Sequence, residues 1–276
     1  MRQSAWLMRV LAAIFAALPS VSWAYETLSI PPAPIPNAPN ARPAPEPMRA
    51  KLYLPKGSAP APVIIVLHTC AGISDGELVG QWADRVNDWG YAALVLDSFT
   101  ARGLSNVCSK NDPRNATPFD RSVDVINAAM VLTQTPSVDG SRIGVVGMSH
   151  GGSTAVTVTR RVFNAVRPGL IKAAVDMYGG CAAPEFHGQT PLLVLAGDAD
   201  NWGYPAKSCL EFQSKLPPGA VMEVHTFPGV YHAFDNPILG RVVTFEGHAM
   251  KYDHDAAKES FALTRAFFDR YVRDAK

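Results

Sequence analysis

Short apolar segments rich in β-branched residues alternate with longer segments of helical periodicity along most of this 276-residue chain. Residues 63–67 form a continuous apolar run, which is typical of a strand buried on both faces of a parallel sheet. Residues 78–89 and 119–132 instead carry apolar side chains at helical intervals. Because parallel strands are joined by crossovers, this order predicts an α/β fold with a mostly parallel central sheet and helices on both faces.

The same two patterns predict the remaining elements. Residues 49–54 alternate between apolar and polar side chains, as an edge strand does. The other predicted strands cover residues 92–96, 143–147, 173–177, 192–196 and 221–227, and further helices open near Gly151, span residues 205–216 and run from His254 to about Val272. No internal repeat or charge run divides this alternation, so residues 48–276 are predicted to form a single domain.

The N-terminus has the layout of a secretory signal peptide. Arg2 and Arg9 precede the apolar residues 10–18, and small residues flank Trp23 within residues 22–24, as at a cleavage site. The apolar run is too short to span a bilayer. We therefore expect residues 1–24 to be removed on export to the periplasm or the medium, with no stable membrane insertion of the remaining chain.

Residues 25–47 are rich in proline and are predicted to form an extended lead-in ahead of the domain. The charge composition limits the partners of the whole chain, because 25 Lys and Arg face 24 Asp and Glu. Such a balance gives no clustered positive face of the kind that binds nucleic acid. The four Cys are too few for a disulfide scaffold.

The sequence Gly-Met-Ser-His-Gly at residues 147–151 matches the pattern G-x-S-x-G. It directly follows a predicted strand and precedes a predicted helix, which is the context of a nucleophile elbow. Small flanking residues allow the strained turn that raises a Ser side chain above the sheet. Ser149 is therefore the predicted nucleophile. The motif alone leaves open a glycine-rich turn without chemistry.

A serine nucleophile needs a base, and the base needs an acid that orients it. In this architecture the acid follows a later strand and the histidine follows the last one. His232 comes shortly after residues 221–227 and is the predicted base. Asp198 and Asp200 share the loop after residues 192–196; the spacing favours Asp200 as the acid and Asp198 as a turn cap.

The oxyanion hole is expected to combine two backbone N–H groups. One belongs to His150, the residue after the nucleophile. The other comes from the loop after the first buried strand, where we expect Cys70 to supply it, with Thr69 as the alternative. His68, in the same loop, is expected to be a structural residue that hydrogen-bonds to the backbone.

Five motifs occur together along the chain: HTCAG (68–72), DSFTARG (97–103), GMSHGG (147–152), GDAD (197–200) and YHAFDNP (231–237). With them the sequence resembles the dienelactone hydrolase family of α/β-hydrolases over nearly the whole chain that follows the signal segment. The resemblance implies the α/β-hydrolase fold, an esterase or lactonase activity and a triad of Ser149, Asp200 and His232.

The sequence departs from that family at two points. The namesake enzymes use a Cys nucleophile where Ser149 stands. They also bind the substrate carboxylate with two arginines; Arg102 matches the first, whereas Asp235 and Asn236 stand where the second would be. A dianionic lactone is therefore not the expected natural substrate.

Aromatic residues close to the predicted acid are candidates for the substrate pocket. We expect Trp202 and Tyr204 to line it together with Arg102, and Phe99 is a further candidate.

In an exported protein the four cysteines are expected to form disulfides, because an even number of cysteines in an oxidising compartment favours pairing. Four cysteines allow three pairings. In the α/β-hydrolase fold the loops that carry Cys70 and Cys108 lie above one edge of the sheet, and Cys181 and Cys209 reach the same edge. Our hypothesis is therefore Cys70–Cys108 and Cys181–Cys209, with both bridges bracing active-site loops.

Together these features predict a serine hydrolase that cleaves a small carboxylic ester or lactone through an acyl-enzyme, with no cofactor and no metal. The spacing of His248, Asp253 and His254 fits no standard metal pattern, and a helix start at His254 explains it. Two alternatives stay open: a secreted serine peptidase on the same fold, and a non-catalytic binding protein that retains the hydrolase shell. The oligomeric state is not predicted.

Overall fold

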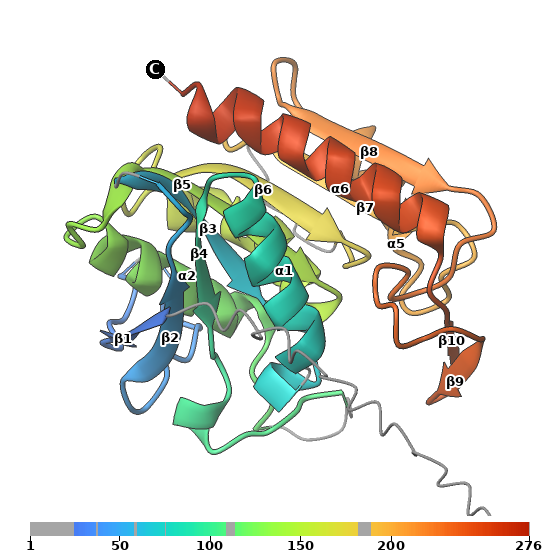
Figure 1. Ribbon diagram of the computed structural model, residues 1–276, viewed down its shortest axis with the longest axis horizontal. Helices are drawn as coiled ribbons and strands as arrows, with labels where there is room; N and C mark the ends of the chain where they lie inside the picture. The colour runs from blue at the N-terminus through green and yellow to red at the C-terminus, as the bar shows by residue number, and fades with distance from the viewer. Residues whose placement is uncertain are drawn as a thin grey trace, which may run out of the picture.

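The computed structural model describes residues 25–275 apart from residues 37, 58–59, 75, 109–113 and 182–188. Eight strands form one sheet in the order β1-β2-β4-β3-β5-β6-β7-β8 (Figure 1). The α/β architecture that the sequence predicts is confirmed. The predicted signal peptide, residues 1–24, lies outside the described residues. Within the described residues, no helix is both long enough and apolar enough to cross a membrane.

The central strands pair in parallel and are buried on both faces, as the continuous apolar runs predict. All six side chains from Pro62 to Leu67 are buried. The parallel strands are β3 (Ala61–Leu67), β4 (Ala92–Leu96), β5 (Val138–Met148), β6 (Ile171–Met177), β7 (Leu192–Gly197) and β8 (Met222–Phe227). Because they run in one direction, their carboxyl ends meet along one edge of the sheet.

Helices cover both faces of the sheet. One face carries α1 (Gly76–Asp88) and α6 (His254–Phe268), which continues as a π-helical turn, Asp269–Arg273 (Figure 1). Trp82 and Phe268 from these helices share a core with Val66 of β3. The opposite face carries α2 (Pro118–Leu132), α3 (His150–Val158), α4 (Arg161–Asn164) and α5 (Pro205–Gln213), and two short 3₁₀ turns are Gly72–Ser74 and Thr100–Arg102.

The N-terminal part of the predicted lead-in is a strand. Tyr25–Ile30 forms β1, which pairs antiparallel with β2 (Met48–Tyr53). The prediction that residues 49–54 form an edge strand is therefore wrong, since β1 lies outside β2. Six residues that alternate weakly gave too little periodicity to find β1, whereas the backbone edge that β2 presents gives it a partner. The proline-rich remainder lies against the body, where Ile35 and Ala44 are buried.

A hairpin of β9 (Val243–Phe245) and β10 (His248–Met250) stands apart from the main sheet, at the lower right of Figure 1. No sequence pattern predicts this hairpin, because each strand has only three residues. The hairpin is tied to the loop after β8: Met250 forms a bridge with His232, and the Lys251 N–H donates to the His232 carbonyl (3.2 Å).

Two disulfides link loops at the carboxyl edge of the sheet. Cys70 pairs with Cys108 and Cys181 pairs with Cys209, with Cα–Cα distances of 4.8 and 4.9 Å. No cysteine remains free. This is the pairing that the fold argument predicts. The first bridge joins the loops after β3 and β4, and the second joins the loop after β6 to α5.

Replacing both Cys181 and Cys209 with Ala is expected to lower the free energy of unfolding by about 2–4 kcal/mol, because the unfolded chain loses a cross-link. The two residues are 28 positions apart and both are buried, so Ala avoids a new buried polar group. Urea denaturation of oxidised protein measures the change. An unchanged urea midpoint in the variant would contradict the prediction. It would also be contradicted if reductant lowered the midpoint of the variant as much as it lowers that of the wild type.

Candidate active site

Ser149 occupies a sharp turn between β5 and α3. Its backbone has φ 53° and ψ −115°, which a residue with a side chain seldom adopts. The turn depends on glycine neighbours: a Cβ on Gly147 would lie 2.0 Å from the Gly151 carbonyl oxygen, and one on Gly152 would lie 2.1 Å from Asp176 Oδ1. The motif therefore folds into a strand-to-helix elbow that raises Ser149 above the carboxyl edge of the sheet.

Ser149, His232 and Asp200 form one line of hydrogen bonds. His232 Nε2 lies 2.9 Å from Ser149 Oγ, and His232 Nδ1 lies 2.7 Å from Asp200 Oδ2. A carboxylate only accepts, so Nδ1 carries the ring proton and Nε2 accepts from the serine hydroxyl. The other oxygen of Asp200 accepts from the Trp202 N–H (2.7 Å). Asp200 and His232 are 1% and 4% exposed, which holds this line out of bulk water.

Asp198, the alternative acid, points elsewhere. Its Oδ1 accepts from the Gly229 N–H (2.6 Å), and its own N–H donates to the Phe227 carbonyl (3.1 Å). Asp198 thus caps the turn that follows β8, which is the role that its position at the strand end indicates.

The two backbone groups expected to form an oxyanion hole flank this line. His150 opens α3, so its N–H has no intrahelical acceptor. Cys70 lies in the loop after β3, where its carbonyl accepts from the Val107 N–H (2.7 Å), and Thr69 Oγ1 accepts from the Ala71 N–H (3.1 Å). These bonds fix the loop next to Ser149, and both Thr69 and Cys70 line the same cavity as the serine.

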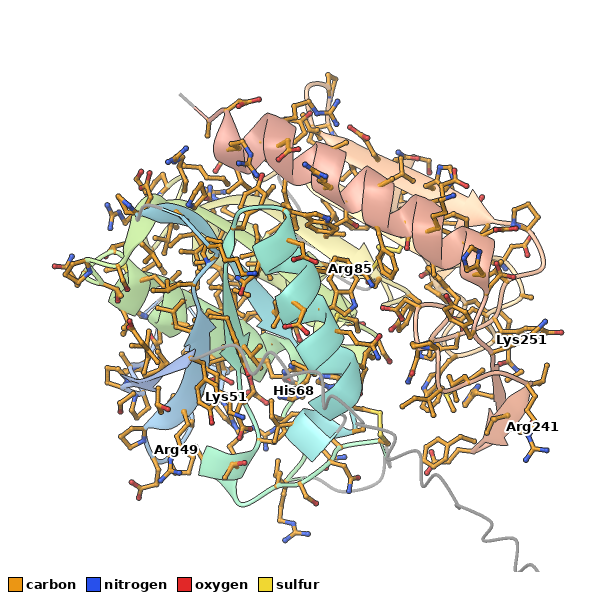
Figure 2. All side chains as sticks on the ribbon, viewed as in Figure 1. Arg49, Lys51, His68, Arg85, Arg241 and Lys251 are labelled. Atoms are coloured by element: carbon orange, nitrogen blue, oxygen red, sulfur yellow. A yellow bond between two sulfur atoms is a disulfide. The ribbon has the colours of Figure 1, made fainter. Side chains whose placement is uncertain are left out.

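His68, labelled in Figure 2, lies at the end of β3 and has a structural role. Its Nε2 accepts from the Ser98 N–H (3.3 Å), so Nδ1 carries the proton and donates to the Thr69 carbonyl (2.8 Å). Burial, followed by the nearby Arg121 charge, holds the pKa of His68 well below its usual range. The ring therefore stays neutral and braces the loop that carries Cys70.

A cavity of about 350 Å³ opens at Ser149. The Trp202 ring stacks on His248 at 4.7 Å and lies 5.0 Å from the His232 ring. Other apolar side chains complete the wall: Leu78, Leu239, Phe245 and Met250. The structure therefore brings Ser149, His232, Cys70 and Trp202 to one mainly apolar cavity, to which the unpredicted hairpin contributes Phe245 and Met250. Asp200 does not line the cavity and contacts it through His232.

Two predicted pocket residues do not line this cavity. The Arg102 side chain is 8% exposed, and its guanidinium pairs with both oxygens of buried Asp124 (2.8 and 2.9 Å). Asp124 of α2 thus pairs with Arg102 inside the fold, away from the residues that line the cavity. Tyr204 precedes α5 and is 61% exposed, away from the cavity. Phe99 is buried against His68 (4.5 Å) rather than exposed to the cavity.

Tyr178, which no sequence motif identifies, lies behind the proposed base. Its ring meets His232 edge-on at 4.9 Å, and its hydroxyl donates to Asp235 Oδ1 (2.6 Å). Trp82 Nε1 donates to the other oxygen of Asp235 (2.7 Å). Burial raises the pKa of Asp235. The only sequence signal for Tyr178 is its position one residue past a predicted strand.

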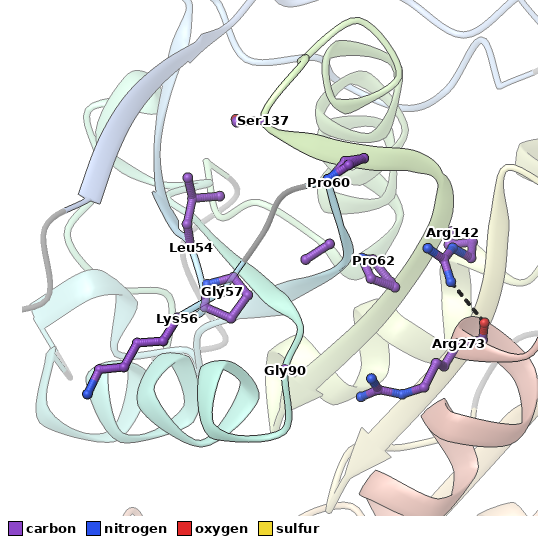
Figure 3. A pocket seen from close by; sticks show the side chains of 11 residues that line it. Leu54, Lys56, Gly57, Pro60, Pro62, Gly90, Ser137, Arg142 and Arg273 are labelled. Carbon is purple, nitrogen blue, oxygen red and sulfur yellow. Dashed lines mark hydrogen bonds between the residues drawn. The ribbon is translucent and has the colours of Figure 1, made fainter.

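A second cavity, of about 360 Å³, lies at the opposite edge of the sheet, where β3 and β5 begin (Figure 3). Its basic groups are already engaged: Arg142 Nε pairs with Asp139 (2.6 Å), and Arg142 Nη1 donates to the Arg273 carbonyl (3.0 Å). Arg273 Nε in turn donates to Asp269 (2.9 Å). This cavity holds none of the predicted site residues.

The sheet, the elbow and the order of its partners define an α/β-hydrolase. The model of the dienelactone hydrolase family matches residues 48–272, and the chain belongs to that family. It is therefore a hydrolase. A search of curated proteins finds no match.

Solved structures share the fold at low sequence identity. A dienelactone hydrolase-like promiscuous phosphotriesterase, P91, from metagenomic libraries is 20% identical with a TM-score of 0.64, covering 90% of this chain and 99% of its own. A dienelactone hydrolase from Anabaena variabilis is 17% identical with a TM-score of 0.61, covering 91% and 99%. Est1E from Butyrivibrio proteoclasticus, bound to ferulic acid, is 16% identical with a TM-score of 0.58, covering 83% and 96%.

Asp176, at the end of β6, is a buried carboxyl directly behind the elbow. Its Oδ1 accepts from the Gly179 N–H (2.6 Å), whereas Oδ2 has no partner among the described residues. Burial, with a contribution from the Asp200 charge, raises the pKa of Asp176 to about 8. The sulfurs of Cys181 and Cys209 lie within 4.8 Å of this carboxyl, but their disulfide leaves no thiolate to bind a metal with it.

Asp176 is expected to make the protein less stable as pH rises. The unfolded chain releases this proton near pH 4, whereas the folded protein keeps it up to about pH 8, so stability falls between these values. Asp176→Asn is neutral at every pH and keeps an acceptor for the Gly179 N–H. Thermal unfolding at pH 5 and pH 8 should show a smaller decline in midpoint for the variant. Equal declines would contradict the prediction.

Proposed function

We propose that this protein is a serine carboxylic ester hydrolase in which Ser149 is the nucleophile, His232 the general base and Asp200 the residue that orients the base. The observation that carries the proposal is the unbroken hydrogen-bond line at the wall of an apolar cavity, with distances of 2.9 and 2.7 Å. This is the arrangement that activates a serine hydroxyl at neutral pH.

The proposed reaction has two acyl-transfer steps. His232 Nε2 takes the proton of Ser149 as its Oγ attacks the ester carbonyl, and the N–H groups of Cys70 and His150 donate to the oxyanion that forms. The tetrahedral intermediate collapses, His232 gives its proton to the leaving alcohol, and an acyl-serine remains. His232 then takes a proton from a water molecule as it attacks the acyl-serine carbonyl. The acyl–Oγ bond breaks, the acid leaves, and His232 returns the proton to Ser149 Oγ. Every step uses only groups of this chain and water.

The cavity supports a small ester or lactone as the substrate. Its aromatic and aliphatic wall, including Trp202 and Phe245, suits an uncharged ring or short chain, and its volume of about 350 Å³ limits the size of that group. With Arg102 paired inside the fold, the clamp for a substrate carboxylate that the family resemblance implies is not formed. Neutral esters are therefore favoured over anionic ones. The balance of 25 basic and 24 acidic residues supports no nucleic acid partner.

We also propose that the protein acts after export, in the periplasm or outside the cell. The signal-like pattern of residues 1–24 supports this location, as do the two disulfides, which persist in oxidising compartments.

Ser149→Ala is expected to lower kcat for 4-nitrophenyl acetate and butyrate by about 10⁴-fold or more, because the nucleophile is lost. Ser153→Ala is a matched control one turn along α3 and should keep a rate within a few-fold of the wild type. Equal rates for Ser149→Ala and the wild type would favour the non-catalytic binding protein. Faster turnover of aminoacyl anilides than of esters would favour the peptidase.

Asp200→Asn and Asp198→Asn form a second matched pair of variants. Asn at residue 200 can present its amide N–H to His232 and favour the wrong ring tautomer, so kcat should fall by up to about 10⁴-fold. Asn at residue 198 still accepts from the Gly229 N–H and should leave kcat within a few-fold. Steady-state kinetics on 4-nitrophenyl butyrate measure both. The reverse result would make Asp198 the orienting acid.

A further inference from the structure

Arg121 of α2 is a fully buried cation directly beneath the proposed site. Its Nη1 donates to His150 Nδ1 (2.9 Å), and its Nη2 donates to the His68 carbonyl oxygen (3.0 Å). One guanidinium thus connects two segments that are far apart in the sequence: the end of β3 and the first residue of α3.

In the described part of the chain, no carboxylate forms an ion pair with this guanidinium. Asp120 pairs with Arg42 (2.8 Å), and Asp124 is held by both outer nitrogens of Arg102. Arg121 Nε has no hydrogen-bond partner among the described residues. Burial lowers the pKa of Arg121 to about 9, so the group stays protonated at neutral pH. A buried charge without a paired carboxylate is costly to fold, and this one is placed at the site.

The contact with Arg121 also determines the protonation state of His150. A guanidinium has only donors, so His150 Nδ1 must be unprotonated and the ring neutral. Burial and the Arg121 charge lower the pKa of His150 to about 3, in agreement with that state. The Phe99 ring covers the group, 5.1 Å from the Arg121 guanidinium and 6.2 Å from the His150 ring.

Both segments lead directly to the proposed oxyanion donors. Only Thr69 separates His68, whose carbonyl Arg121 contacts, from Cys70, whose N–H is the first donor. His150, whose ring Arg121 contacts, supplies the second donor through its own backbone N–H. We infer that Arg121 is the positioning residue of the oxyanion hole: it ties the two donor segments together and places a positive charge beneath them. This inference rests on the proposed esterase function.

The role predicts a particular kinetic signature. The negative charge on the carbonyl oxygen appears only at the tetrahedral stage, so donors and a cation aimed at it stabilise the transition state rather than the bound ester. Loss of Arg121 should therefore lower kcat and leave KM nearly unchanged. A residue that only supported the fold would lower the amount of active protein, with no selective effect on binding of a tetrahedral ligand.

The experiment compares Arg121→Met, which keeps much of the length without charge or donors, with Arg121→Lys, which keeps the charge but cannot make the same two-pronged contact. On 4-nitrophenyl butyrate we expect kcat per folded active site to fall about 100-fold for Met and about 10-fold for Lys, with KM within about threefold of the wild type. Arg142→Met removes a partly buried arginine at the opposite edge of the sheet and is the control, with unchanged kcat.

A second measurement uses phenylboronic acid, which forms a tetrahedral adduct with an active serine. Its inhibition constant should rise about in step with the loss of kcat in the Arg121 variants. His150→Leu removes the acceptor but keeps the backbone N–H, and it keeps the charge of Arg121. It should lower kcat less than Arg121→Met, and the double variant should be no worse than Arg121→Met alone. This variant tests the contact even where Arg121→Met does not fold.

The outcomes separate the two hypotheses. If Ser149→Ala is as active as the wild type, the proposed function and this inference both fail. If Ser149→Ala is inactive but the folded Arg121 variants, or His150→Leu where Met does not fold, keep kcat and boronate affinity within about twofold of the wild type, the inference alone is overturned. Selective loss of kcat and boronate affinity supports it.

Discussion

Ser149 has a backbone conformation that costs a residue with a side chain on the order of 1–3 kcal/mol, and the packing around the elbow is what holds it there. The Ser149 N–H donates to the Met177 carbonyl (2.9 Å), which ties the turn to β6. Gly151 brings the start of α3 so close to β3 that a Cβ would lie 2.4 Å from the Leu67 carbonyl oxygen. The direction of the serine side chain therefore follows from contacts with both neighbouring strands, and His232 and Asp200 are placed relative to that fixed point.

The buried charges around the elbow follow from the same close packing. Helix α2 presents Asp120, Arg121 and Asp124 to the interior, where all three are buried. Each carboxylate is paired with an arginine from another segment, Arg42 or Arg102. Arg121 instead donates to the His68 carbonyl and to His150 Nδ1, and among the described residues it has no carboxylate partner. A half-satisfied polar network is destabilising, so its retention next to the site is better explained by what it positions than by stability.

The sequence predicted the parts of this protein in which local pattern and tertiary packing agree. The strand predicted at residues 92–96 has the same bounds as β4, whose five residues are all buried as a continuous apolar run predicts. The elbow and its partners follow from strand order. Arg102 and Tyr204 do not line the cavity, and a motif could not show this because it gives a residue's position along the chain but not its partner. Asp124, which lies outside every motif that carries the family resemblance, is the partner that holds this arginine inside the fold. The hairpin and β1 were missed because three to six residues carry too little periodicity.

The residue at position 149 and the Cys70–Cys108 disulfide constrain each other chemically, because they line one cavity. Cys70 and Cys108 line the same cavity as Ser149. A thiolate at position 149, activated by His232, would be a nucleophile facing a disulfide in its own cavity, and thiolate attack on a disulfide sulfur is the elementary step of exchange. A serine alkoxide equivalent does not enter that exchange to give a stable product. A disulfide in the wall of this cavity is therefore chemically compatible with a serine at residue 149 in a way that it is not with a cysteine, in a chain whose cysteines are all paired.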